Sequence, residues 1–220
     1  MRSHEPFDPG TFCSLLTELV EIDPGSAATF ASSLDSGSWR KEALQRVSQI
    51  WTSKDAASAE CWAASLADES ERRAALTNVC VELAQSRAEA AVRLAESYGL
   101  EAHSGTLMET LAQQWANQDF SAAAAWVIAK PASEMREQMV MRLAYVQAAT
   151  RPEEAARFVV QEIPDSPVQG EAVISVIYQW ARRDLAGASK WVGLFPEGPL
   201  RERAESELAN LAANQSQEQR

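Results

Sequence analysis

The sequence predicts an all-α fold: a right-handed α-solenoid of about six two-helix repeats with a period of 32 residues, plus an N-terminal capping helix. Three observations predict it. A Trp–Asp–Trp motif recurs, with the Asp four residues after the first Trp and the second Trp seven residues after the Asp. Apolar residues follow the 3.6-residue spacing of helices. A unit of this size cannot bury its apolar face alone, so neighbouring units must complete the core.

Each unit is anchored by a residue that begins its first predicted helix. The anchors recur every 32 or 33 residues and are Asp23, Asp55, Arg87, Asp119, Arg151 and Asp184. Asp accepts hydrogen bonds from the free N–H groups of a helix start, and Pro suits the first helical position. Small residues four and eight positions on share one face with a large residue seven positions on. We expect this face to be the core, with the large residue filling the gap between close helices.

In every unit, a short stretch of turn residues ends the first helix, and a second helix follows it. Turn residues such as Pro131, Pro164 and Pro196 separate it from the first helix. The second helices are predicted at 38–52, 69–85, 104–117, 133–149, 167–182 and 199–213. An Arg recurs near four of their starts, where a cation opposes the helix dipole. We therefore expect Arg40, Arg72, Arg136 and Arg201 to bind a carboxylate or a turn carbonyl.

The repeat accounts for nearly the whole chain as one solenoid domain, residues 1–220. We expect residues 8–22 to form the capping helix, residues 23–213 to form six helical hairpins and residues 214–220 to form a polar tail. The Trp–Asp–Trp form appears in the second, fourth and sixth units, which indicates a doubled unit of 64 residues. Trp39 is the one Trp outside the pattern.

The Trp–Asp–Trp motif also resembles the repeat motif of a known family. Trp115-Ala116, Asp119 and Trp126, and again Trp180-Ala181, Asp184, Trp191 and Pro196, match a Trp-Ala-x-x-Asp-Pro-x-x-Ala-x-x-Trp pattern. The chain resembles bacterial tetratricopeptide-like α-helical hairpin repeat proteins over about residues 8–210. It departs from them where Arg87 and Arg151 replace the Asp. The resemblance implies a helical scaffold and no chemistry.

Charge and composition limit the classes of partner that this protein is expected to bind. The formal net charge is −11 and the pI about 4.7. This negative net charge argues against nucleic acid and against an anionic membrane surface as partners. The N-terminal sequence lacks the apolar run of a signal peptide, and no stretch approaches the roughly 18 apolar residues of a spanning helix. Cys13, Cys61 and Cys80 lack disulfide or zinc spacing, so we expect a cytoplasmic protein with reduced thiols.

Residues that could support catalysis are few. The histidines are His4 and His103, and a solvated loop histidine is the favoured interpretation of His103. Cys61 with His103 could form a nucleophile pair, but an inert thiol is favoured. No metal, phosphate or hydrolase motif occurs. The sequence therefore predicts no catalytic residue, no metal, no cofactor and no enzyme.

Candidate binding residues lie where the repeat does not dictate the side chain. Positions six and nine residues after the anchor point away from the predicted core face. The candidates there are Arg93, Ile128, Arg157, Val160 and Lys190. First helices of helical-hairpin solenoids usually line the concave side, so these residues would form a groove suited to a peptide with acidic and apolar groups.

These observations favour a non-catalytic scaffold or adaptor that binds a protein or peptide on a concave helical surface. The alternative is a ligand- or peptide-sensing regulatory domain. A deep, closed groove with convergent polar groups would favour the alternative. A helical-toroid enzyme is the third class, and a metal or a perturbed carboxylate pair would be its sign.

Overall fold

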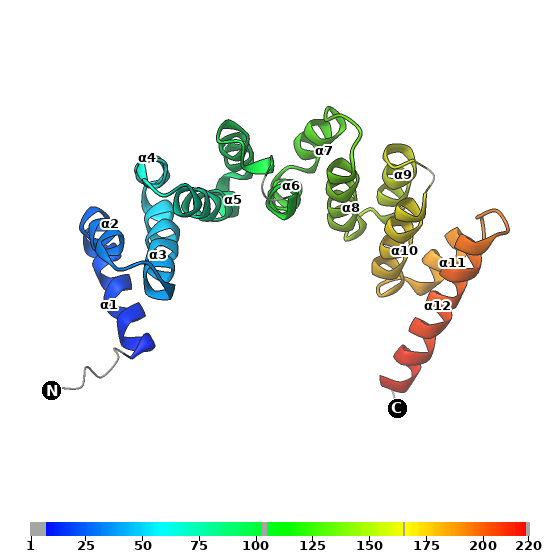
Figure 1. Cartoon of the computed structure of the whole chain (residues 1–220). Coiled ribbons are helices and arrows are strands. Elements are labelled where there is room, and N and C mark those ends of the chain that lie inside the picture. Colours follow the sequence, from blue (N-terminus) through cyan, green and yellow to red (C-terminus); the bar gives the residue numbers. More distant parts are fainter. Residues whose placement is uncertain (1–7, 103–104, 165, 219–220) are drawn as a thin grey trace. The chain divides into compact units, whose positions relative to one another are not determined.

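The computed structural model describes residues 8–102, 105–164 and 166–218, and this part of the chain contains α-helices and no strand (Figure 1). The all-α prediction is confirmed. Two stretches with strand-like composition, 158–163 and 172–178, are helical over most or all of their length. His4 and His103 lie outside the described residues.

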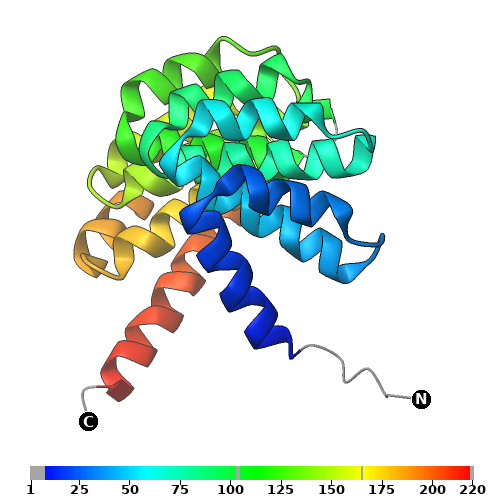
Figure 2. The ribbon, with the colours of Figure 1, turned by 90° about the vertical axis from the view of Figure 1, so that its left-hand side faces the viewer.

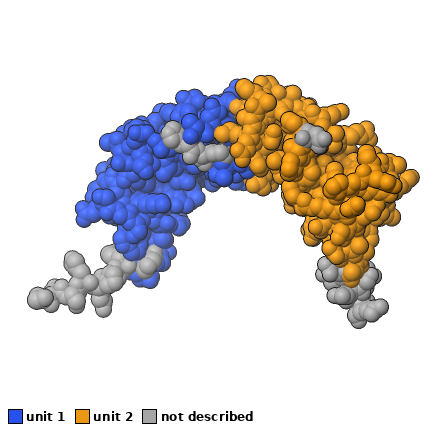
Figure 3. All heavy atoms as spheres, turned by 45° about the vertical axis from the view of Figure 1, so that its right-hand side comes forward, with its two compact units in different colours: residues 1–111 blue, residues 112–220 orange. Residues whose placement is uncertain are grey.

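The chain divides into two compact units, residues 1–111 and 112–220 (Figure 3). The helices of the first unit are α1 (Pro9–Ile22), α2 (Pro24–Ser33), α3 (Ser38–Lys54), α4 (Ala56–Ser65) and α5 (Glu69–Ser97), followed by a 3-10 turn, η1 (Leu100–Ala102). The division falls within α6 (Gly105–Gln118). The second unit continues with α7 (Phe120–Ile128), α8 (Glu134–Ala148), α9 (Pro152–Glu162), α10 (Pro167–Ala181), α11 (Leu185–Val192) and α12 (Pro199–Glu218).

Four aspartates begin helices as predicted. Each accepts a hydrogen bond from the backbone N–H three residues on, at 3.1 Å for Asp23 and Asp55, 3.0 Å for Asp119 and 2.8 Å for Asp184. Their backbones are nearly the same, from φ −147°, ψ 92° at Asp119 to φ −142°, ψ 82° at Asp184. At Asp23, Asp55 and Asp119 this single residue ends one helix and caps the next, whereas Asp184 caps α11 two residues after Arg182, the residue that ends α10.

The two arginine anchors have similar backbone angles. A new helix is predicted to begin at Arg87, and α5 is divided there into two helical stretches by a kink, with Arg87 outside helical geometry at φ −140°, ψ 62°. Arg151 has φ −135° and ψ 68°, and no side-chain cap bond. Helix α8 ends at Ala148, and α9 begins directly after Arg151 at Pro152, which has no N–H to donate.

The predicted core face is buried. The residue four positions after each anchor is alanine and has no exposed surface: Ala27, Ala59, Ala91, Ala123, Ala155 and Ala188. The column eight positions after each anchor is buried as well: Ala31, Ala63, Ala95, Val127, Val159 and Val192. The methyl group of alanine lets the backbones of neighbouring helices approach closely.

The paired tryptophans pack against each other across the helix junctions. Ring centroids are 5.8 Å apart in Trp51–Trp62, 5.6 Å in Trp115–Trp126 and 5.9 Å in Trp180–Trp191. The two members are not equally buried in the second and third pairs. Trp115 and Trp180 are buried, whereas Trp51, Trp62, Trp126 and Trp191 are half-buried. The prediction of core packing therefore holds best for Trp115 and Trp180.

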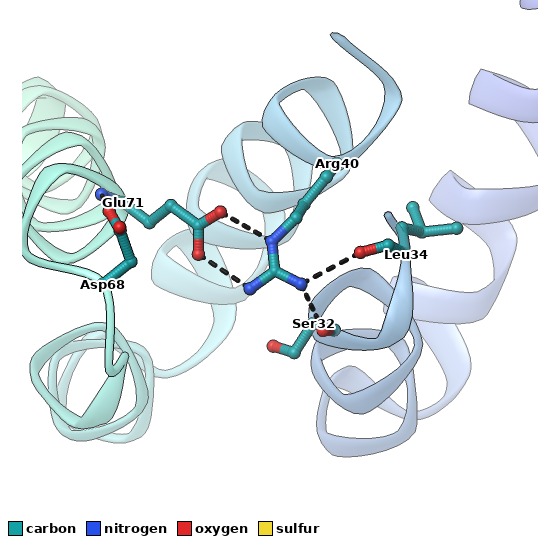
Figure 4. Close-up of polar contacts among 5 residues, drawn as sticks. All are labelled: Ser32, Leu34, Arg40, Asp68 and Glu71. Atoms are coloured by element: carbon teal, nitrogen blue, oxygen red, sulfur yellow. Dashed lines mark hydrogen bonds and ion pairs between the residues drawn. The ribbon is translucent and has the colours of Figure 1, made fainter. Parts of the chain in front are cut away.

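The recurring arginines bind as predicted. The carbonyls at a helix end lack intrahelical partners, and Arg72 donates to the Leu66 carbonyl at 2.7 Å, as Arg201 does to that of Phe195 at 3.3 Å. Arg40 donates to the Leu34 carbonyl at 3.0 Å and holds the Glu71 carboxylate through two nitrogens at 2.6 and 2.8 Å (Figure 4). These hydrogen bonds raise the pKa of Arg40. Arg136 donates to the Glu162 carbonyl at 2.7 Å and pairs with the Glu162 carboxylate. The arginines thereby fix the turn before their own helix, or an end of a later helix.

We predict that Trp115→Ala costs more stability than Trp126→Ala. Truncating a buried Trp removes about 3–5 kcal/mol of unfolding free energy, and the half-buried Trp126 loses less contact. Urea denaturation followed by circular dichroism measures both. An equal loss for the two variants would contradict the unequal burial.

A second prediction concerns pH. Hydrogen bonds from the Ser26 hydroxyl and N–H hold the pKa of Asp23 below its usual value. The carboxylate therefore contributes stability above the ordinary Asp range near pH ~4, and this is lost as the pH falls through the folded-state pKa. Ser26→Ala should raise the pKa of Asp23 in an NMR titration and leave that of Asp55 as it is. An unchanged Asp23 pKa would show that the hydroxyl does not hold it.

Candidate functional site

The five predicted binding residues are all exposed. Arg93 belongs to the first unit, and Ile128, Arg157, Val160 and Lys190 belong to the second. The prediction of outward-facing positions on the first helices agrees with this exposure. Their assembly into one groove stays a prediction, because the two units are described separately.

Two of the predicted cations are already paired. Arg93 is bonded to Glu89 and Arg157 to Glu153, at 3.2 Å in the second case. In both pairs the Glu lies four residues earlier on the same helix and both side chains are largely exposed. Such pairs contribute little to stability and are easily exchanged for another partner. The arginines are thus available to a peptide carboxylate, at the cost of a weak surface pair.

Val160 lies at the mouth of an apolar hollow in the second unit. The hollow measures about 330 Å³ and is lined by Val160 of α9, Val173 of α10, Trp191 of α11, and Phe195, Pro199 and Leu200 beyond α11. The side chain of Val160 is 54% exposed. This C-terminal hollow is therefore an open, aromatic-lined depression that carries one of the predicted residues.

The walls of the C-terminal hollow are held by specific contacts. Trp191 packs edge-on against Phe195 at 4.6 Å between ring centroids. Gln169 Nε2 donates to the Ile163 carbonyl at 2.8 Å, which closes the turn between α9 and α10. Pro196 and Pro199 fix φ on either side of Gly198. Leu194, next to this turn, is 77% exposed. The hollow is thus preformed, with a further apolar side chain beside it.

Charged groups of both signs lie at the C-terminal hollow. Arg201 and Glu197 are among the residues that line it. Arg157 precedes Val160 by three residues on α9, so the two share a face, and Lys190 precedes Trp191 on α11. Three of these four charged residues are cationic, so the hollow suits an apolar side chain next to an acidic one.

A second and larger hollow was missed by the sequence analysis. It measures about 550 Å³ and lies in the first unit, with a lining that includes Phe12, Leu15 and Leu19 of α1, Phe30 and Leu34 of α2, and Trp39 of α3. Phe12 packs edge-on against Trp39 at 4.8 Å. One signal for this N-terminal hollow was present in the sequence: Trp39 is the Trp that the repeat does not explain.

The described residues were compared with the groups that a metal site or a nucleophile requires. They contain no group of three or more His, Cys, Asp or Glu side chains that could hold a metal ion. Burial raises the pKa of the Cys80 thiol to about 12, with Glu60 adding to the effect. A thiol so protonated is a poor nucleophile. Cys13, Cys61 and Cys80 are free cysteines. The surface chemistry is that of packing and ion pairing.

Comparison with protein-family models, with curated proteins and with solved structures gave no match. In the described part of the chain, no helix combines the length and the apolar character needed to cross a membrane.

Proposed function

We propose that this protein is a non-catalytic scaffold or adaptor that binds a protein or peptide segment, and that the C-terminal hollow is one contact site. The observation that carries the proposal is the depression lined by Val160, Trp191 and Phe195, with Arg201 and Glu197 also in its lining and with Arg157 and Lys190 close to Val160 and Trp191 in the sequence. Peptide sites of this kind use an aromatic-lined pocket as the anchor and surrounding charge for register.

The proposal includes the solenoid architecture. Support comes from the helix starts after Asp23, Asp55, Asp119 and Asp184, which share one backbone geometry. Further support comes from the buried alanine that follows each anchor at the same distance. A tetratricopeptide-like repeat with a 32-residue period accounts for both. The concave placement of the first helices remains part of the proposal.

Two further parts of the proposal concern chemistry and location. An absence of enzymatic activity is supported by the protonated, buried Cys80 and by the structural use of the repeated Asp side chains as helix caps. A cytoplasmic location is supported by the free cysteines. The partner best suited to the C-terminal hollow is an acidic peptide with an apolar anchor, as the flanking cations indicate.

The experiment is selection of peptides from a random library on the full chain, followed by calorimetry with the selected peptides. We predict enrichment of acidic residues next to a large apolar residue. Val160→Asp should weaken binding roughly tenfold or more, because it places a charge at the mouth of the hollow. Val160 is half exposed, so the variant should remain folded.

The matched control is Val81→Asp on α5, which changes an exposed valine outside the hollow. It should bind the selected peptides as the unchanged protein does. Equal binding by the Val160→Asp variant would contradict the assignment of the site, and a failure to select any peptide would contradict the proposed function itself.

A further inference from the structure

The N-terminal hollow continues into an apolar stripe along α1. Leu15, Leu19 and Ile22 recur at helical spacing and share one face. Leu15 is 52% exposed and Ile22 is 83% exposed. A capping helix is expected to present a polar outer face. The outer face of α1 instead carries the apolar residues that helices elsewhere in this chain bury.

The second unit contains residues at the positions of the repeat that are equivalent to those of the N-terminal hollow. Counted from Asp184, Trp191, Phe195 and Leu200 stand where Phe30, Leu34 and Trp39 stand from Asp23. Likewise Val176 of α10, like Leu15 of α1, lies eight residues before its Asp. Val176 is 1% exposed. The two hollows are therefore built from equivalent positions.

The difference lies in the neighbours. Helix α10 packs against α8 and α9 as well as against α11 and α12. Helix α1 packs against α2 and α3 (Figures 1 and 2), and no helix precedes it within the described residues. Val176 of α10 lies beside Met141 and Tyr145 of α8, and α9 also packs against α10, whereas the corresponding face of α1 is open. Its geometry is that of a helix-binding groove.

The charge around the N-terminal hollow indicates which kind of partner can bind there. Residues 8–39 contain five acidic side chains and no Lys or Arg: Asp8, Glu18, Glu21, Asp23 and Asp35. Asp35 lines the hollow, and Glu18 lies on α1 between Leu15 and Leu19. Glu21 is paired with Lys54 at 2.5 Å, and Arg40, the first cation after this stretch, is held by Glu71 and by carbonyls. A second copy of this chain carries net charge −11 and would be repelled. The complementary occupant is basic.

We propose that the open face of α1, with Phe30 of α2 and Trp39 of α3, binds an amphipathic helix of another protein. This helix presents an apolar stripe of small and medium-sized residues to Leu15 and Leu19. Lys or Arg residues flank the stripe and face the carboxylates around the groove. The site is separate from the C-terminal hollow and extends the proposed function to a second class of partner, since the C-terminal hollow suits acidic peptides.

The test uses the full chain and a synthetic peptide of residues 151–163, which contains α9, with Glu153→Lys, Glu154→Lys and Glu162→Lys. These changes keep the apolar face of α9 and make its flanks basic. The unsubstituted peptide and a scrambled version of the basic peptide are the controls. Binding is followed by calorimetry, and by the fluorescence anisotropy of a labelled peptide at two salt concentrations.

We expect the basic peptide to bind, and the unsubstituted and scrambled peptides to bind roughly tenfold or more weakly. Leu15→Asp should weaken the basic peptide by a similar factor, because it introduces a charge into the apolar stripe. Val160→Asp should leave this peptide unaffected. Circular dichroism of the Leu15→Asp variant verifies folding, and Leu15→Ser serves as a milder variant if that one unfolds.

Three results would overturn the proposal. Equal binding of the basic and scrambled peptides would show attraction to net charge alone. Unchanged affinity in both Leu15 variants would place the peptide elsewhere. A dimer in analytical ultracentrifugation that Leu15→Asp dissociates would make a second copy the occupant. Because Val160→Asp tests only the C-terminal hollow, failure of one site is distinguishable from failure of the other.

Discussion

Close helix approach at six buried alanines is the contact on which the rest of the structure depends. Each alanine follows an anchor residue by four positions and is fully buried. A larger side chain there would push the neighbouring helix away, because protein interiors have no spare volume. The large residue seven positions after the anchor, three times a Trp, lies one turn further on and is half-buried in all three cases.

The hollows follow from the same constraint. A helix of this chain presents an apolar face that only the next helices cover, so a face without such neighbours stays open. Val176 and Leu15 occupy equivalent positions, and the first is buried while the second is half exposed. The packing that builds the interior thus also creates a surface suited to a helical partner.

Much of the local structure could be predicted from the sequence, because it depends on residues close together in the chain. The Asp caps and most of the arginine bonds to turn carbonyls involve partners within a few residues, whereas Arg136 donates to the Glu162 carbonyl 26 residues further along the chain. The helix start predicted at Arg87 corresponds to a kink in α5, where the backbone angles resemble those of Arg151. The position in the repeat therefore predicted a non-helical residue at both arginine anchors.

The candidate sites were less predictable. Exposure of Val160 followed from helical spacing, but its place beside Trp191 and Phe195 depends on how α9, α11 and the turn after α11 pack. The N-terminal hollow joins Phe12 to Trp39 across two helix junctions. Pairing of Arg157 with Glu153 also changes the expected charge of the surface. Each of these features depends on which neighbour is present, which no local pattern specifies.

The central claim is that uncovered apolar faces, and not the acidic surface as a whole, recognise partners. The most direct measurement is methyl NMR of the full chain, labelled at Leu and Val, during titration with the lysine-substituted peptide of residues 151–163. The account predicts saturable shifts at Leu15, Leu19 and Leu34, with Val81 and Val160 unmoved. Shifts spread evenly over exposed methyl groups, or absent from Leu15, would contradict it.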